Sequence, residues 1–146
     1  MGFLRPRETV STLDEINLDG LIERGIRFVL LDLDNTLGGR HSGRLDDGVE
    51  PFLDRAEELG ISIGILTNRR RAVEDDAVVL LRARVPLLHN AGKPLRRGYL
   101  RLLEQLGGTP NQAAMVGDRI LTDIIGANLL GIYAIRIRRS ALQENH

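Results

Sequence analysis

The chain has 146 residues with 20 basic and 20 acidic side chains, so no net charge marks it for nucleic acid or an anionic lipid surface. It has no cysteine, which excludes disulfides, thiolate metal sites and a cysteine nucleophile. Its apolar stretches fall short of the roughly 20 residues that span a bilayer, and residues 1–7 lack the apolar core of a secretory signal, so one cytoplasmic domain over residues 1–146 is expected.

Apolar strands alternate with amphipathic helices along the chain. In order, the pattern predicts a helix near residue 17, a strand at 26–31, a helix at 49–59, a strand at 61–66, a helix at 73–81, a strand at 85–88, a helix at 95–106, a strand at 113–116, a helix at 124–129 and a strand at 132–137. Such alternation predicts an α/β fold with a single doubly wound parallel sheet of about five strands. The last strand alternates apolar and polar residues, as an edge strand would.

Helical spacing also predicts buried faces and stops. Glycines at 60, 107 and 131 are expected to end three of the helices. The buried face of the helix at 73–81 is expected to hold Val73, Ala77, Leu80 and Leu81. That of the helix at 124–129 is expected to hold Ile124, Ile125, Asn128 and Leu129, with Thr122 as the N-cap.

Two carboxylates stand at the end of the first long strand, in Asp32-Leu33-Asp34-Asn35-Thr36. Alternate residues of an extended chain share a face, so Asp32, Asp34 and Thr36 would converge if the strand geometry continued. Carboxylates that close repel each other unless a cation lies between them or one is protonated. The pattern suits a divalent cation with oxygen ligands and a carboxylate nucleophile, and the alternative is a strand that ends in turn-forming residues.

Three further groups of polar residues each follow a predicted strand. They are Thr67-Asn68, Lys93, and Gly117-Asp118 with Asp123. Together with the Asp32–Thr36 segment they are called the four stations below. Binding sites of open parallel sheets form beyond the carboxyl ends of the strands, so these groups would gather on one edge. Lys93 is the only lysine in the chain, which itself singles it out as a compact point charge. The four stations together favour a functional site over the turn interpretation.

These residues carry a resemblance to a known family. The stations resemble the four motifs of the haloacid dehalogenase superfamily of magnesium-dependent phosphotransferases, over roughly residues 14–138. The stretches Asp34-Asn35-Thr36-Leu37, Gly92-Lys93-Pro94-Leu95 and the segment from Gly117 to Asn128 resemble subfamily IIIA, and in particular its small YqeG-like branch, which is related to phosphatidylglycerophosphate phosphatases.

The resemblance implies a phosphatase with a Rossmannoid fold and a Mg²⁺ cofactor. Asp32 would attack phosphorus to form an aspartyl-phosphate, and Asp34 would act as general acid and then general base. Mg²⁺ would bind Asp32, the backbone carbonyl of Asp34 and Asp118. Thr36 and Gly117 would support these groups.

The remaining motifs would bind the substrate and balance its charge. Thr67 and the amide of Asn68 would hold phosphate oxygens. Lys93 would offset the charge of the nucleophile and the phosphoryl group, since phosphoryl transfer depends chiefly on positioning and electrostatics. Asp123 would orient Lys93 or a water molecule on the metal.

The cap insertions of this superfamily have no room here. The two segments that could hold one, residues 38–48 and 68–92, have only 11 and 25 residues. A capless domain needs another way to exclude water. A bulky phosphorylated substrate, such as a phosphorylated lipid reached by peripheral membrane contact, is preferred over a neighbouring subunit, because the composition marks no large apolar interface.

A second hypothesis keeps the same carboxylates without the chemistry. The chain would then be a phospho-binding regulatory or scaffold domain with negligible turnover. A receiver-type signalling domain also combines aspartates, a lysine and a parallel sheet. It has no Gly-Asp motif with a further aspartate after its lysine, so the order of the motifs argues against it.

Overall fold

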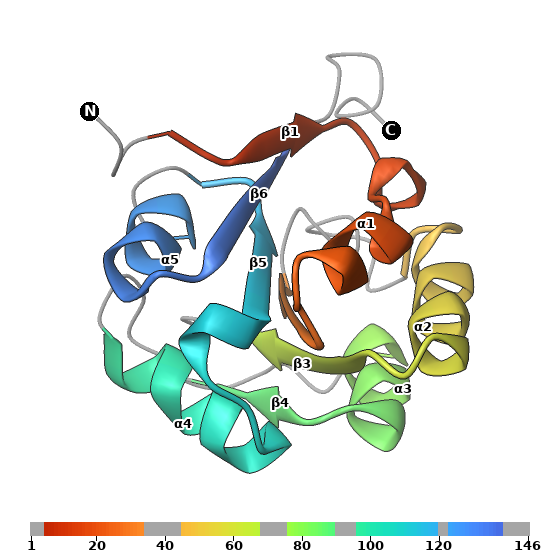
Figure 1. Ribbon diagram of the computed structural model, residues 1–146. Helices are drawn as coiled ribbons and strands as arrows, with labels where there is room; N and C mark the ends of the chain where they lie inside the picture. The colour runs from red at the N-terminus through yellow and green to blue at the C-terminus, as the bar shows by residue number, and fades with distance from the viewer. Residues whose placement is uncertain (1–4, 34–44, 68–75, 90–95, 120–122, 139–146) are drawn as a thin grey trace.

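A computed structural model describes residues 5–33, 45–67, 76–89, 96–119 and 123–138 of the chain (Figure 1). In this structure six strands form one parallel sheet in the order β1-β6-β5-β2-β3-β4. The strands are β1 (Glu8–Val10), β2 (Phe28–Asp32), β3 (Ser62–Leu66), β4 (Leu87–Leu88), β5 (Ala113–Gly117) and β6 (Tyr133–Ile137). The doubly wound parallel sheet is confirmed, and β1 is a strand that the sequence pattern did not reveal.

The prediction of an edge strand at 132–137 is wrong. β1 pairs with the outer side of β6, with Glu8 opposite Ile135, so that β1 and β4 are the edges. Arg136, one of the polar residues that suggested an edge strand, forms a hydrogen bond instead. Arg136 lies near the carboxyl end of β6, where its Nε donates a hydrogen bond to the backbone carbonyl of Asp118 at 3.4 Å.

Within the described residues, five α-helices flank the sheet. Figure 1 shows α1, α2 and α3 on one face and α4 and α5 on the other. Asn17 caps the first of them by accepting a hydrogen bond from the N–H of Gly20, and glycines with positive φ follow α2, α4 and α5 as expected. The helices are α1 (Leu18–Glu23), α2 (Val49–Glu58), α3 (Asp76–Arg84), α4 (Arg96–Leu106) and α5 (Ile125–Leu130), and two short 3₁₀ turns are η2 (Leu13–Glu15) and η3 (Pro110–Gln112).

Two predicted buried faces need correction. In α3 the side chain of Leu80 is 51% exposed, whereas Val78 and Leu81 are buried. The apolar run 77–81 winds around the whole helix, so the sequence offered no unique face. In α5 the exposed residue is Leu129, and Ala127 is buried instead. The predicted positions Val73 and Thr122 lie outside the described residues.

Strand alternation separates two hydrophobic cores. The first core lies between the sheet and α1, α2 and α3, and includes Val29, Leu31, Ile63 and Ile65. The second core lies between the sheet and α4 and α5. Its members are Leu30, Leu66, Tyr99, Leu102, Leu103, Ala113, Met115, Ile124, Ala127, Ile132 and Ala134. Successive residues of β2 therefore alternate between the two cores.

The described elements form no second unit beside this sheet and its flanking helices. Among the described residues, none of the helices combines the length and apolarity needed to cross a membrane.

Candidate active site

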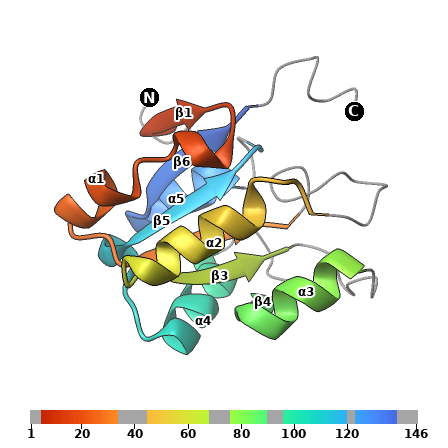
Figure 2. The ribbon, with the colours of Figure 1, turned by 90° about the vertical axis from the view of Figure 1, so that its right-hand side faces the viewer.

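Three aspartates meet at the carboxyl edge of the sheet. Asp32 is the last residue of β2, Asp118 directly follows β5, and Asp123 precedes α5. One carboxylate oxygen from each lies within 4.8 Å of the others. β2 and β5 are neighbours, and the chain leaves β2 toward β3 on its other side, so the cluster lies at a topological switch point. Figure 2, which looks onto α2 and α3, shows β3 and β5 ending at the same edge.

A short loop fixes two of these aspartates relative to each other. The backbone carbonyl of Arg119 accepts a hydrogen bond from the N–H of Asp123 at 2.9 Å. In return, the N–H of Arg119 donates to Oδ2 of Asp123 at 3.2 Å. The Asp123 carboxylate therefore closes the loop that begins with Asp118, and it does so in a fully buried position.

Gly117 makes room for this arrangement. A Cβ atom at position 117 would collide with Oδ2 of Asp123, at a separation that Cβ atoms in proteins do not show. The carboxylate of Asp123 thus packs directly against the backbone at the end of β5. The glycine of the predicted Gly117-Asp118 motif has a steric reason, which is the close approach of an acidic side chain.

The cluster concentrates negative charge where little water reaches it. Asp32 is 6% exposed and Asp123 is fully buried, while Asp118 is half-buried. Ionised carboxylates are costly in such places unless they are paired or coordinate a cation. The three carboxylates offer only hard oxygen donors, which suits Mg²⁺ and disfavours soft metals.

Tyr99 of α4 packs beneath the cluster. Its side chain is fully buried, and its hydroxyl donates a hydrogen bond to the backbone carbonyl of Asp123 at 3.3 Å. Burial raises the pKa of the Tyr99 phenol, and the charges of Asp123 and Asp32 raise it further, so the phenol stays protonated. Sequence analysis assigned Tyr99 no role. The available signal was a hydroxyl on an otherwise aliphatic helical face.

Thr67 reaches the same edge from β3. Its neighbour Leu66 is in register with Asp32, and the N–H of Thr67 donates to the carbonyl of Leu88 in β4 at 3.1 Å. The residue is buried. The structure therefore brings Thr67, Gly117 and the three aspartates to one edge. Four of the predicted site residues lie outside the described residues: Asp34, Thr36, Asn68 and Lys93.

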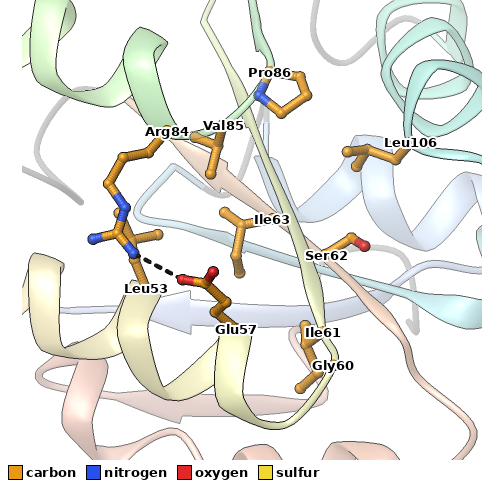
Figure 3. A pocket seen from close by; sticks show the side chains of 10 residues that line it. All are labelled: Leu53, Glu57, Gly60, Ile61, Ser62, Ile63, Arg84, Val85, Pro86 and Leu106. Carbon is orange, nitrogen blue, oxygen red and sulfur yellow. Dashed lines mark hydrogen bonds and ion pairs between the residues drawn. The ribbon is translucent and has the colours of Figure 1, made fainter.

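A hollow of about 600 Å³ lies at the opposite end of the strands from the carboxylate cluster, near the amino end of β3. Figure 3 shows its position between the ends of α2, α3 and β3, with Ser62 at the start of the strand. The guanidinium of Arg84 at its border pairs with Glu57 at 3.5 Å and with Asp54 at 2.9 Å. None of the predicted site residues lines this hollow, so it is separate from the carboxylate cluster.

The family of haloacid dehalogenase-like hydrolases matches residues 7–131 of the chain. The chain belongs to this family. The predicted superfamily is thereby confirmed, and with it the prediction that this haloacid dehalogenase-like hydrolase is an enzyme.

Curated relatives agree with the predicted branch. "Probable phosphatase YqeG" of Bacillus subtilis is 26% identical over 136 residues, which cover 92% of this chain and 77% of that protein. "Phosphatidylglycerophosphate phosphatase 1, chloroplastic/mitochondrial" of Arabidopsis thaliana is 29% identical over 142 residues, which cover 91% of this chain but only 40% of the plant protein. Both names are those of phosphatases, in agreement with the enzyme class predicted from the motifs.

A solved structure shows the same fold. An uncharacterized protein from Listeria monocytogenes serotype 4b superimposes with a TM-score of 0.65 at 24% identity, over 77% of this chain and 79% of that one. At this identity the likeness concerns the fold alone.

Proposed function

We propose that this haloacid dehalogenase-like hydrolase is a Mg²⁺-dependent phosphatase that hydrolyses a phosphate monoester through an aspartyl-phosphate on Asp32. The observation that carries the proposal is the convergence of Asp32, Asp118 and Asp123 within 4.8 Å, at the edge that Thr67 also reaches. The phosphatase names of the relatives support the same class of reaction.

The donors at this edge fit Mg²⁺. We assign the ion to Asp32 and Asp118, with the backbone carbonyl of Asp34 as a further ligand, because buried all-oxygen sites with several carboxylates suit a small hard cation. When bound, the ion would offset the negative charge that a phosphoryl group brings to these carboxylates.

The residues then divide the reaction between them. A carboxylate oxygen of Asp32 attacks phosphorus and displaces the alcohol, whose oxygen takes a proton from Asp34. Asp34 next removes a proton from water, the water oxygen attacks the aspartyl-phosphate, and inorganic phosphate leaves with the Asp32 carboxylate restored. Asp32 is poised for the first step at the end of a buried strand, where it has little freedom to move.

Other groups hold and neutralise the phosphoryl oxygens. Thr67 and the amide of Asn68 bind them, Lys93 supplies the positive charge, and Thr36, Gly117 and Asp123 support the arrangement. The position of Thr67 supports its role, since Thr67 is buried directly beyond β3 and beside the strand that carries Asp32.

We further propose that residues 1–146 form a single capless domain whose site is covered by its own substrate. A lipid phosphate such as phosphatidylglycerophosphate is the candidate, supported by the similarity to the plant phosphatase. Its diacyl part would remain in the bilayer while the phosphate enters the site. A neighbouring subunit that covers the site is the competing arrangement.

The test is phosphate release by the purified chain in 5 mM MgCl₂ or in excess EDTA. The substrates are a small sugar phosphate and vesicles that contain phosphatidylglycerophosphate, and the mass in solution is measured in parallel. We expect Mg²⁺-dependent release that favours the vesicles. Phosphate binding without turnover of either substrate would support a phospho-binding domain instead. Efficient hydrolysis of the small ester by a strict monomer would contradict both covering arrangements.

A further inference from the structure

The second core contains one polar group that packing alone does not call for. Tyr99 is fully buried in this core, and its side chain carries a hydroxyl among aliphatic neighbours. A buried hydroxyl costs free energy unless it forms a hydrogen bond, and a phenylalanine would fill the same space without that cost. The hydroxyl at position 99 therefore needs a reason beyond the burial of a ring.

The hydroxyl acts on the backbone of the site. It donates to the carbonyl of Asp123, the residue whose own side chain accepts the N–H of Arg119. The same residue is thus held at three points: its carbonyl is bound from α4, and its carboxylate and its N–H are both bound by the backbone of Arg119 in the loop after β5. A shift of the Asp123 backbone would move its carboxylate relative to Asp32 and Asp118.

Close packing leaves this contact little freedom. A Cβ atom at Gly126 would lie 2.6 Å from the Tyr99 hydroxyl oxygen and 2.7 Å from its ring, so α5 lies directly against the tyrosine. On the other side, Gly117 lets the Asp123 carboxylate pack against β5. Tyr99 and Asp123 are therefore both confined between two segments whose glycines leave no space for a methyl group.

We propose that Tyr99 is a positioning residue for the metal site: its hydroxyl fixes the backbone at Asp123, whose carboxylate closes the loop that begins with Asp118, and thereby keeps Asp118 close enough to Asp32 for the two to share one cation. This inference rests on the magnesium site of the proposed function. Tyr99 acts through Asp123 and touches neither substrate nor metal. A merely structural hydroxyl would affect the stability of the metal-free protein and leave its affinity for Mg²⁺ unchanged.

The chain offers a matched control, because its second tyrosine makes a comparable bond elsewhere. The hydroxyl of Tyr133 donates to Glu8 at 2.8 Å, at the start of β6 and on the first-core side. Tyr99→Phe and Tyr133→Phe each remove one hydrogen-bonded phenol oxygen and keep the ring. Only the first of these bonds involves the site.

The experiment is calorimetric titration of MgCl₂ into the wild-type protein and the two variants. We expect Tyr99→Phe to weaken Mg²⁺ binding by about three- to ten-fold, the effect of losing one buried hydrogen bond, and Tyr133→Phe to bind as the wild type does. In turnover assays, the Mg²⁺ concentration for half-maximal rate should rise by the same factor in Tyr99→Phe, with kcat at saturating Mg²⁺ within about two-fold.

The outcomes separate the two proposals. Wild-type protein that does not bind Mg²⁺ would overturn the magnesium part of the proposed function. A wild type that binds Mg²⁺ while Tyr99→Phe binds it equally well would overturn the role of Tyr99 alone. If Tyr99→Phe does not fold, Gly126→Ala supplies the same test, because its added methyl displaces the ring and should weaken Mg²⁺ binding in the same direction.

Discussion

The two faces of the sheet differ in what they support. The first core, under α1, α2 and α3, is a conventional hydrophobic interior that ends at the sheet. The second core, under α4 and α5, continues into the site, because Asp32 shares its face of β2 with Leu30 and Gly117 shares its face of β5 with Met115. Asp32 and Gly117 therefore extend the second-core face of their strands, whereas Thr67 follows Ile65 of the first core.

Glycines show the same asymmetry. The described strands contain two glycines, Gly64 and Gly117, and both lie on the second-core face. A Cβ at Gly64 would come within 2.9 Å of Leu106, so α4 packs against the backbone of β3 itself. Close helix–sheet contact on this face leaves little slack beneath the carboxylates. We infer that the second core holds the site rigid, whereas the first core mainly supplies stability.

The largest effect should come from Asp32→Asn. An amide is a poor nucleophile, so turnover should fall by at least about 10³-fold while the fold persists. The preceding residue, Leu31, faces the first core and provides the control, since Leu31→Met conserves volume and should keep near-normal activity. Phosphate release and circular dichroism measure both variants. Substantial turnover by Asp32→Asn would remove this residue from the mechanism.

A second effect concerns the response of stability to metal. Mg²⁺ that binds only the folded state stabilises it by mass action, about 2.7 kcal/mol at 100 times its Kd. Asp118→Asn should weaken that response, and it should raise the stability of the metal-free protein because one charge leaves the cluster. Asp54→Asn, at an exposed position of α2, is the control, and its stabilisation by Mg²⁺ should equal that of the wild type. The measurement is the melting temperature with and without MgCl₂. An identical response in both variants would contradict the assignment of the ion.

A smaller effect should separate a tightly packed glycine from an open one. Gly64→Ala should destabilise the protein by about 1–3 kcal/mol, because the methyl collides with Leu102 and Leu106 in the second core. Gly48→Ala has open space around it and a backbone at φ −81° that alanine adopts, but Gly48 is the N-cap of α2, where glycine is preferred to alanine. The two effects oppose each other, so the stability should change by no more than about 0.5 kcal/mol. Urea denaturation measures both variants. Equal changes would mean that the second core is no tighter than the surface.

The smallest effect appears only at alkaline pH. The folded protein raises the pKa of Tyr99, so above about pH 10 the unfolded chain releases a proton that the folded chain keeps. Stability from this group is fully present below pH 10 and falls above it, by up to about 1.4 kcal/mol per pH unit. Burial and the Glu8 bond also raise the pKa of the half-buried Tyr133. Urea denaturation at pH 9 to 11 should show that the free energy of unfolding falls less steeply with pH in Tyr99→Phe than in Tyr133→Phe.

The sequence predicted the parts of the fold that have a strong periodic signal. Strands such as 61–66 are continuous apolar runs, and α2 and α4 have regular apolar stripes, so their type and place followed directly. The sequence did not reveal β1, because a strand of three residues with only one of them buried shows no periodic pattern. The buried face of α3 could not be predicted, because a run of five apolar residues fits any face of a helix. Only contact with the first core selects Val78 and Leu81.

The site followed from topology more than from local pattern. Asp32, Thr67 and Asp118 end or follow parallel strands, so the rule that such ends share an edge placed them together. What the sequence could not supply is the reach of a side chain across elements. The motif placed Asp123 at this edge, but it did not reveal that the Asp123 carboxylate accepts the N–H of Arg119, or that Tyr99 reaches Asp123 from a helix 24 residues earlier. Both contacts depend on packing distances that spacing along the chain does not encode.

The pairing of β1 with β6 has a consequence for how the chain folds. Glu8 lies opposite Ile135, so this contact joins residues separated by nearly the whole described chain. During synthesis β1 leaves the ribosome first, yet its partner strand emerges last, and loop closure over such a length is slow. Until β5 has emerged, the inner strands β2 and β3 can pair with each other, while the edge of β2 that β5 will cover stays open. The site, which needs β5, is therefore among the last features to form.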